Sequence, residues 1–211
     1  MDFINADITN YAEAHTAPET ALLKKINRDT HANVLKPRML SGHMQGRILS
    51  MISNMIRPAT ILEIGTYTGY SAICLCEGLR AGGKLITIER NEELEEKLKS
   101  YFTTAGLDEV IDLKIGDATK ILKTLEGTFD LVFIDADKEN YSNYYDLIID
   151  KVPTGGFILA DNVLWSGKVL DPSPDKDTKA ILSFNTKVHN DPRVENVLLS
   201  VRDGIMVMRK V

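Results

Sequence analysis

Residues 61–71 read ILEIGTYTGYS, and this stretch decides the fold. It opens with a short apolar run, passes through a loop with glycines at positions 65 and 69, and leads into a stretch of helical character. Glycine lets a backbone turn tightly and pass close to a ligand. A strand that runs into such a loop and then into a helix is typical of open parallel sheets, whose ligands bind outside the carboxyl ends of the strands.

The same alternation of strand and helix continues along the chain. The further short apolar runs lie at residues 84–88, 111–115, 131–134 and 156–159. The amphipathic stretches between the runs lie at residues 70–80, 91–105, 118–125 and 141–151. Strands that alternate with helices predict βαβ units, and hence an α/β fold with a parallel sheet covered by helices on both faces.

The C-terminal part breaks this alternation. Residues 194–201 and 205–209 both have the character of strands, and Arg202-Asp203-Gly204 alone separates them. An Asp-Gly pair between two apolar runs is typical of a β-hairpin. We therefore expect the last strand to run antiparallel to the one before it, at the end of an otherwise parallel sheet.

The N-terminal part, residues 1–57, is interpreted as helical. Thr16 and Glu19 are spaced as a capping box, with Pro18 in the first turn. Farther along, apolar residues recur at helical offsets, and we interpret the methionines among them, Met44, Met51 and Met55, as core packing. The whole chain, 1–211, is expected to form a single domain in which residues 58–211 are the α/β core.

Composition limits the class of protein. The 211 residues include 25 lysines and arginines against 30 aspartates and glutamates, a formal net charge of −5, whereas nucleic-acid binders are usually basic. Cys74 and Cys76 would point to opposite sides of a helix, so we expect no disulfide and a reducing compartment. We see neither a secretory leader nor an apolar run near the ~20 residues that span a bilayer. A cytoplasmic protein is therefore expected.

Each predicted parallel strand brings an acidic side chain to its carboxyl end. These side chains are Glu63, Glu89, Asp117, Asp135 and Asp161. A carboxylate beside the glycine loop would repel a pyrophosphate but tolerate an ammonium group, which disfavours NAD and ATP. An acid at the end of the second strand suits ribose hydroxyls, and residues 116–118 fall where an adenine would lie. Together these features favour S-adenosylmethionine as the cofactor.

Oxygen ligands gather after the fourth and fifth strands. Asp135, Asp161 and Asn162 suit a hard divalent cation, with Mg²⁺ first and Mn²⁺ or Ca²⁺ as alternatives. Zinc is disfavoured because no cysteine or histidine is near them in sequence. Spacing alone leaves open that these side chains cap helices or face solvent.

Two further side chains near this edge carry chemistry. Lys138 lies three residues after Asp135, and a lysine that is partly removed from water beside a cation is able to act as a base. A surface ion pair with Asp135 or Asp137 is the alternative. Trp165, the only tryptophan, either forms a wall for an aromatic substrate or covers the core.

Residues 63–71, 133–141 and 161–167, taken in order, resemble the cation-dependent O-methyltransferases, the caffeoyl-CoA and catechol O-methyltransferase group. Residues 203–205 are also similar to that family, and the resemblance spans roughly Met39 to Arg209. It implies the class I S-adenosylmethionine-dependent methyltransferase fold, which is Rossmann-like, with seven mostly parallel strands, an antiparallel last strand and extra N-terminal helices. Relatives are commonly homodimers, so a homodimer is expected here.

The resemblance also implies roles for residues. Asp135, Asp161 and Asn162 match metal ligands, and Lys138 matches a general base that acts beside Asp135. Lys138, Asn162 and Trp165 are expected at the substrate. Met39 and Ser41 match a segment that closes over the cofactor. The full set expected around the cofactor is Met39, Ser41, Glu63, Gly65, Thr66, Ser71, Glu89, Asp117, Ala118 and Asp135.

Departures from the plant members refine the expected substrate. Residues 125–130 are short where the plant enzymes carry an insertion, and residues 42–45 replace a more acidic stretch. These features favour methylation of one hydroxyl of a small catechol-like or other vicinal-diol phenol over a CoA ester. One alternative is a tRNA hydroxyuridine methyltransferase of the same fold, which the net charge of −5 disfavours. Another is a non-catalytic protein that binds S-adenosylmethionine.

Overall fold

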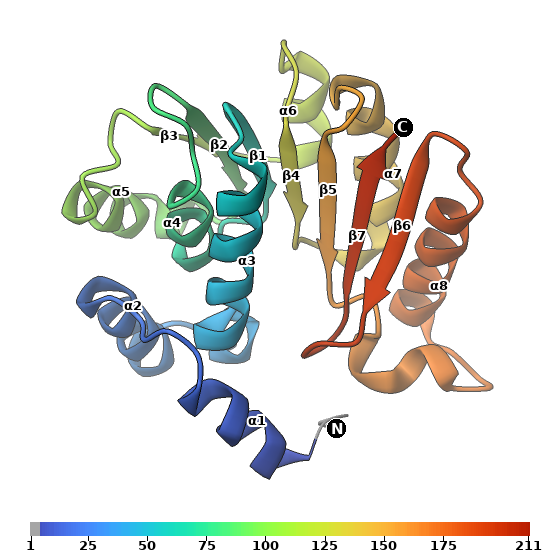
Figure 1. The fold of residues 1–211 in the computed structure, drawn as a ribbon, viewed down its shortest axis with the longest axis horizontal. Coiled ribbons are helices and arrows are strands. Elements are labelled where there is room, and N and C mark those ends of the chain that lie inside the picture. Colours follow the sequence, from blue (N-terminus) through green and yellow to red (C-terminus); the bar gives the residue numbers. More distant parts are fainter. Residues whose placement is uncertain (1–4) are drawn as a thin grey trace.

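The computed structural model describes residues 5–211, and within them seven strands form one sheet in the order β3-β2-β1-β4-β5-β7-β6 (Figure 1). The strands are β1 (Thr60–Ile64), β2 (Lys84–Glu89), β3 (Ile111–Ile115), β4 (Leu131–Ile134), β5 (Phe157–Asp161), β6 (Val194–Leu199) and β7 (Ile205–Lys210). Strands β1 to β5 are parallel, and β7 lies antiparallel between β5 and β6. The expected mostly parallel sheet with an antiparallel last strand is confirmed.

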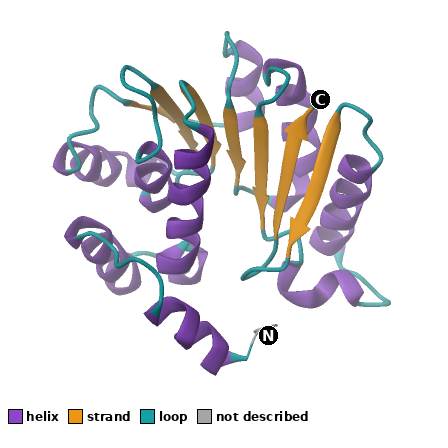
Figure 2. Cartoon of the chain, in the orientation of Figure 1, coloured by secondary structure: helices purple, strands orange, loops and turns teal. Residues whose placement is uncertain are grey.

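Helices cover both faces of the sheet (Figures 1 and 2). One face carries α3 (Gly42–Ile56), α4 (Tyr70–Cys76) and α5 (Glu95–Thr104). Helix α2 (Ala21–Asn33) packs against α4 and α5 near the strand ends, and α1 (Ala6–Ala14) precedes it. The other face carries α6 (Ala118–Thr124), α7 (Tyr141–Ile148) and α8 (Lys176–His189). Short 3-10 segments are η1 (Pro37–Met39), η2 (Glu92–Leu94), η3 (Lys138–Asn140), η4 (Ile149–Lys151) and η5 (Trp165–Leu170).

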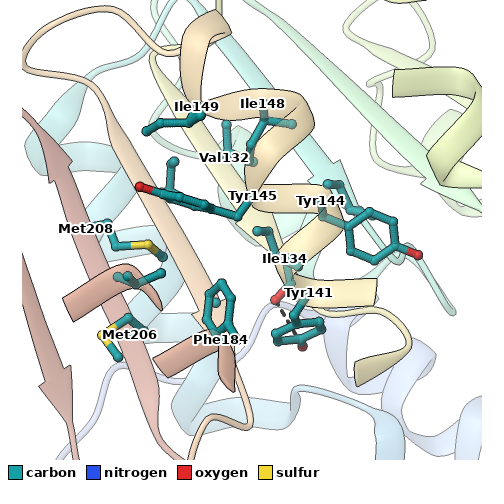
Figure 3. Close-up of a cluster of buried hydrophobic side chains, with 14 of the residues drawn as sticks. Val132, Ile134, Tyr141, Tyr144, Tyr145, Ile148, Ile149, Phe184, Met206 and Met208 are labelled. Carbon is teal, nitrogen blue, oxygen red and sulfur yellow. Dashed lines mark hydrogen bonds between the residues drawn. The ribbon is translucent and has the colours of Figure 1, made fainter. Parts of the chain in front are cut away.

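Each face of the sheet has its own core, because successive side chains of a strand point to opposite faces. On β4, Phe133 faces α3 and α4, whereas Val132 and Ile134 face α7 and α8. Figure 3 shows the second core, where Phe184 of α8 meets Tyr141 of α7 edge to face at a ring distance of 5.4 Å. The two cores hold the sheet rigidly between them.

The register of the central strands brings their carboxyl ends to one level. Ile64 of β1 pairs with Ile134 of β4, and Ile134 pairs with Ala160 of β5. The residues that follow these three, Gly65, Asp135 and Asp161, are therefore neighbours at one edge of the sheet. The expected gathering of strand-end acids arises from this register.

Helix α8 is absent from the sequence analysis, which assigns no element between residues 161 and 194. Asp175 caps its first turn by accepting a hydrogen bond of 2.8 Å from the backbone N–H of Thr178. Ile181, Phe184 and Val188 are buried along one face of the helix. The cap and this helical spacing are the signals that identify the helix.

Two expectations for the N-terminal part are wrong. Helix α2 begins at Ala21, where the side chain of Thr20 rather than Thr16 accepts from the backbone N–H of Leu23 over 3.2 Å. The assignment of the α3 methionines to the core is also wrong for Met51 and Met55, which are 63% and 69% exposed, whereas Met44 is half-buried. Residues 1–4 of the expected N-terminal helical segment lie outside the described residues.

Helix α3 turns its small and polar residues inward for a steric reason. Its buried residues are Gln45, Gly46, Leu49, Ser50 and Ser53. A Cβ at Gly46 would overlap the ring of Tyr70, and one at Gly78 would overlap the backbone of Ser53. Helix α4 and the turn after it thus pack too closely against α3 to admit the larger methionines.

No helix within residues 5–211 combines the length and the apolar character that crossing a membrane requires. The cytoplasmic location expected from the sequence stays a prediction.

Candidate active site

The loop between β1 and α4 is pressed against the end of β4. Gly65 has a φ of 101°, and a Cβ at this position would overlap the backbone carbonyl of Asp135. The backbone N–H of Asp135 donates to Ile64 O over 2.9 Å. Only glycine fits this left-handed position, so the close approach of loop and strand explains why the sequence needs glycine here.

Glu89 anchors the same loop from β2. Its Oε2 accepts a hydrogen bond of 2.6 Å from the backbone N–H of Tyr67, and its Oε1 accepts one of 2.8 Å from the N–H of Asn91. Tyr67 has a φ of 50°, a conformation that non-glycine residues adopt uncommonly. The Glu89 carboxylate thus holds the loop in shape while keeping lone pairs for further donors.

Glu63 lies beneath the loop and is fully buried. Its Oε2 accepts from the hydroxyl of Thr87 over 2.5 Å, and its Oε1 has no hydrogen-bond partner among residues 5–211. Burial, with a smaller contribution from the charges of Asp135 and Glu89, raises the pKa of Glu63 to about 8. The side chain therefore keeps a proton to unusually high pH.

Asp135, which is partly exposed, forms a hydrogen-bonded network with the buried residues Lys138 and Tyr141 at the end of β4. The ammonium of Lys138 donates to Asp135 Oδ1 over 3.0 Å and to the Tyr141 hydroxyl oxygen over 2.5 Å. Tyr141 in turn donates to the backbone oxygen of Asp161 over 3.0 Å. An ammonium has three donors, so one N–H of Lys138 remains for another group. The ion pair of Lys138 with Asp135, which the sequence leaves open as an alternative, is thus present, at a partly buried position.

Asp161 ends β5 beside this network and is 3% exposed. Its Oδ2 accepts a hydrogen bond of 2.7 Å from Nε2 of Gln45, whereas its Oδ1 is buried without a partner in the described part of the chain. Burial, followed by the negative charge of Asp135, raises the pKa of Asp161 well above its usual range. The negative charges of Asp135 and Asp161 therefore interact across the ends of β4 and β5.

The segment after Asp161 is strained and tied to the β6–β7 loop. Asn162, Trp165 and Ser166 have φ values of 57°, 47° and 53°. Asp203 accepts from the N–H of Leu164 through its backbone oxygen over 2.9 Å and from the N–H of Ser166 through Oδ1 over 2.5 Å. Such strain concentrates at functional sites.

Trp165 is brought close to Lys138 by this strained segment. The ammonium of Lys138 lies 5.8 Å from the centre of the Trp165 ring. The indole N–H is buried and finds no acceptor among the residues that the structure describes. Trp165 thus lies beside the polar network, and its predicted role as a wall for an aromatic substrate stays a prediction.

A small cavity connects the remaining expected residues. Its lining includes Met39, Ser41, Gly65, Thr66, Ser71 and Asp135. The side chain of Arg202 donates to the backbone oxygen of Ser41 and so ties the segment over the cavity to the β6–β7 loop. The structure thus gathers six of the residues expected around a cofactor.

Asp117 and Ala118 lie at the end of β3, toward the edge of the sheet. Asp117 is exposed, and its Oδ1 caps α6 by accepting from the backbone N–H of Thr119 over 2.9 Å. Asp117 therefore has a structural role as a helix cap, and its predicted contact with the cofactor stays a prediction.

Gln45, Thr87 and Tyr141 are site residues that the sequence analysis misses. Tyr141 lies three residues after Lys138, a helical spacing that was a usable signal. Gln45 and Thr87 carry no such signal, because their contacts depend on how α3 and β2 meet other elements.

No cluster of three or more histidine, cysteine, aspartate or glutamate side chains within residues 5–211 has the geometry of a metal site. The set expected from the sequence contains two carboxylates and one amide, Asp135, Asp161 and Asn162. Whether this set fits a cation is therefore judged from the hydrogen bonding and charge of its oxygen atoms. The unpartnered Oδ1 of Asp161, beside the charge of Asp135, is the kind of oxygen donor that a hard cation prefers.

Comparisons with known proteins agree with one another. A family model described as O-methyltransferase matches residues 3–211. A probable caffeoyl-CoA O-methyltransferase 2 of Dictyostelium discoideum is 32% identical over 214 residues, covering 98% of this chain and 93% of the relative. The caffeoyl-CoA O-methyltransferase of Medicago sativa is 35% identical over 187 residues, covering 82% of this chain and 75% of the relative.

Solved structures give the same result. The SAH-bound methyltransferase PaMTH1 of Podospora anserina has a TM-score of 0.90 and 29% identity, with 99% of this chain and 97% of that chain covered. The O-methyltransferase TomG of Streptomyces achromogenes, involved in tomaymycin synthesis and in complex with SAM, has a TM-score of 0.90 and 27% identity, covering 97% and 96%.

Proposed function

Since the chain belongs to the O-methyltransferase family and is an S-adenosylmethionine-dependent enzyme of the caffeoyl-CoA O-methyltransferase type, we propose that it methylates one hydroxyl of a catechol-like or other vicinal-diol phenol with the help of a divalent cation. The observation that carries this proposal is that Tyr141 links the Lys138–Asp135 pair to Asp161, whose buried Oδ1 has no partner among the described residues. The whole chain acts as one catalytic domain in this proposal.

Asp135, Asp161 and Asn162 would hold the cation, with Mg²⁺ first and Mn²⁺ or Ca²⁺ as alternatives. Two carboxylates and one amide leave positions for two vicinal oxygens of a substrate. The cation, when bound, acts as a Lewis acid that makes a hydroxyl more acidic. The buried Oδ1 of Asp161 supports this assignment, because buried oxygens are normally paired.

Lys138 is the proposed general base. In this step Lys138 starts as the neutral amine: its Nζ takes the proton of the reacting hydroxyl and becomes the ammonium that donates to Asp135 and Tyr141 over 3.0 Å and 2.5 Å. The remaining N–H can stay on the phenolate oxygen. Proton transfer of this kind typically contributes about 10²–10⁴-fold to a rate.

The proposed cofactor contacts are made by Met39, Ser41, Glu63, Gly65, Thr66, Ser71, Glu89, Asp117, Ala118 and Asp135. S-adenosylmethionine, when bound, supplies the methyl group. The chain contributes alignment, since the closing segment around Ser41 and the loop held by Glu89 fix the two sides of the cavity.

The substrate ring is proposed to lie against Trp165, between Lys138 and Asn162. The tie from Asp203 to the segment around Trp165 keeps this wall in place. An aromatic wall beside a polar cluster suits a flat molecule that presents hydroxyls at one end.

The exposed apolar face of α3 supports a homodimer. Met51 and Met55 lie on that face with most of their surface exposed, and such faces mark interaction sites. Changing both residues to lysine is expected to convert a dimer into a monomer in sedimentation analysis. A monomer at every concentration of the unmodified protein contradicts the homodimer.

The function is tested with purified protein, labelled S-adenosylmethionine and either a panel of catechols or total tRNA. We expect label in the vicinal diols, loss of transfer in EDTA and recovery with Mg²⁺. Full transfer in EDTA contradicts the cation, and label in tRNA alone contradicts the phenolic substrate. Binding of S-adenosylmethionine without transfer to any acceptor contradicts the proposed catalytic role.

A further inference from the structure

Gln45 is a buried polar side chain that reaches from the N-terminal helices into the candidate site. It lies in the first turns of α3 and is 1% exposed. Its Nε2 donates to Oδ2 of Asp161 over 2.7 Å, although 116 residues separate the two in sequence. The contact joins α3 directly to the end of β5.

The two oxygens of Asp161 are in different states because of this contact. Oδ2 is satisfied by Gln45, and Oδ1 has no partner within residues 5–211. The terminal torsion of an aspartate is broad, so a carboxylate without a fixed partner turns easily. The hydrogen bond from Gln45 fixes which oxygen points away from α3.

Other polar residues on the buried face of α3 serve a different purpose. Ser53 donates to the backbone oxygen of Leu75 over 2.6 Å, and Ser50 donates to Glu77 over 2.5 Å. Both bonds tie α3 to α4 and its end. Gln45 contacts a strand-end carboxylate instead, so packing of the two helices does not account for it.

We propose that Gln45 is a positioning residue that holds Oδ2 of Asp161 so that Oδ1 is free and aimed for the divalent cation. The inference rests on the proposed function. Groups that orient metal ligands typically change metal affinity by about 10–100-fold when they are removed. Gln45 would act in this way without touching the cation or the substrate.

The test measures binding as well as turnover, on the full chain. Mn²⁺ is titrated calorimetrically into the unmodified protein, Gln45→Met and Gln45→Asn, and S-adenosylhomocysteine is titrated into each separately. Methionine keeps the length and helix propensity of glutamine but cannot donate, and asparagine keeps the amide but is too short to reach. Ser53→Ala is the matched control, because it removes a buried hydrogen bond from the same helix face.

We expect both Gln45 variants to bind Mn²⁺ about 10-fold or more weakly, with unchanged affinity for S-adenosylhomocysteine, whereas Ser53→Ala changes neither. Unmodified protein that binds Mn²⁺ while the Gln45 variants bind it equally well overturns the inference alone. Unmodified protein that binds no Mn²⁺ overturns the proposed cation and this inference together. Gln45→Asn keeps the test decisive if Gln45→Met does not fold.

Discussion

The two halves of the candidate site satisfy their buried acids in different ways. In the lysine half, which comprises Asp135, Lys138, Tyr141 and Asp161, Asp135 pairs with the ammonium of Lys138, and Asp161 lies within the field of that pair. In the glycine-loop half, which comprises Glu63, Gly65 and Glu89, the acids accept from backbone N–H groups and a threonine hydroxyl. Hydrogen bonds from backbone donors fix the shape of a loop, whereas an ammonium beside carboxylates can exchange a proton with a bound molecule. One half is thus suited to holding a ligand and the other to chemistry.

Removing the charge of Lys138 is the strongest test of this contrast. Lys138→Ala is expected to lower kcat by about 10²–10⁴-fold, because the proposed base is lost, while affinity for S-adenosylhomocysteine stays unchanged. Steady-state kinetics with a catechol and calorimetry measure the two effects. Lys187→Ala, which removes a surface ion pair with Asp146, is the control. An unchanged kcat in Lys138→Ala removes this residue from the mechanism.

Glu63 gives the glycine-loop half a pH-dependent stability. Its pKa is raised to about 8 in the fold from 4.5, so its contribution is fully present below pH 4.5 and is lost as the pH rises to about 8. Relative to Glu63→Gln, the protein should lose stability by at most ~1.4 kcal/mol per pH unit within that window. Urea unfolding of the cofactor-free proteins at pH 5 to 8 measures this. Parallel curves contradict a protonated Glu63.

A substitution of Glu89 tests whether the glycine-loop half binds the cofactor without taking part in methyl transfer. Glu89→Ala removes the carboxylate proposed to accept from the cofactor and also releases the N–H of Tyr67. We expect affinity for S-adenosylhomocysteine to fall by roughly 10–100-fold, since a hydrogen bond between ligand and carboxylate contributes about 1.5–3 kcal/mol. At saturating S-adenosylmethionine, kcat should stay near that of the unmodified protein. A fall in kcat comparable with that of Lys138→Ala would erase the distinction between the halves.

Substitutions of Asp117 are expected to have the smallest effect on stability and binding. They distinguish a role in capping α6 from a role in contacting the cofactor. Asp117→Ala is expected to cost about 1 kcal/mol of stability through the lost N-cap, whereas Asp117→Asn keeps the cap. If Asp117 also contacts the cofactor, Asp117→Asn binds S-adenosylhomocysteine more weakly at unchanged stability. Equal binding by Asp117→Asn leaves capping as the role of this residue. Thermal unfolding and calorimetry provide both readouts.

The sequence predicts the sheet because its signals are local. Short apolar runs with glycine and acidic ends identify the parallel strands, and parallel strands in register necessarily bring Glu63, Glu89, Asp135 and Asp161 to one edge. The fold class and the family follow from these segments. Roles of single side chains at that edge stay predictions, because spacing fixes where a residue lies but not what it binds.

The sequence does not predict which face of α3 is buried, because the shape of the surface that the helix packs against decides this. The apolar stripe of α3 indicates a buried methionine face, yet the close packing of Gly46 and Gly78 selects the polar side. Gln45 is missed for the same reason, since its partner is decided by that rotation. Helix α8 is missed because its apolar residues are spread through a largely polar segment.

The place of β7 has a consequence for synthesis of the protein. This strand comes last along the chain but lies inside the sheet, between β5 and β6, and the loop before it holds the segment around Trp165. As the nascent chain leaves the ribosome, the edge of β5 stays unpaired until residues 205–210 have emerged. A chain shortened before residue 205 would therefore leave the edge of β5 unpaired, and the loop that holds the segment around Trp165 would lose the strand that anchors it.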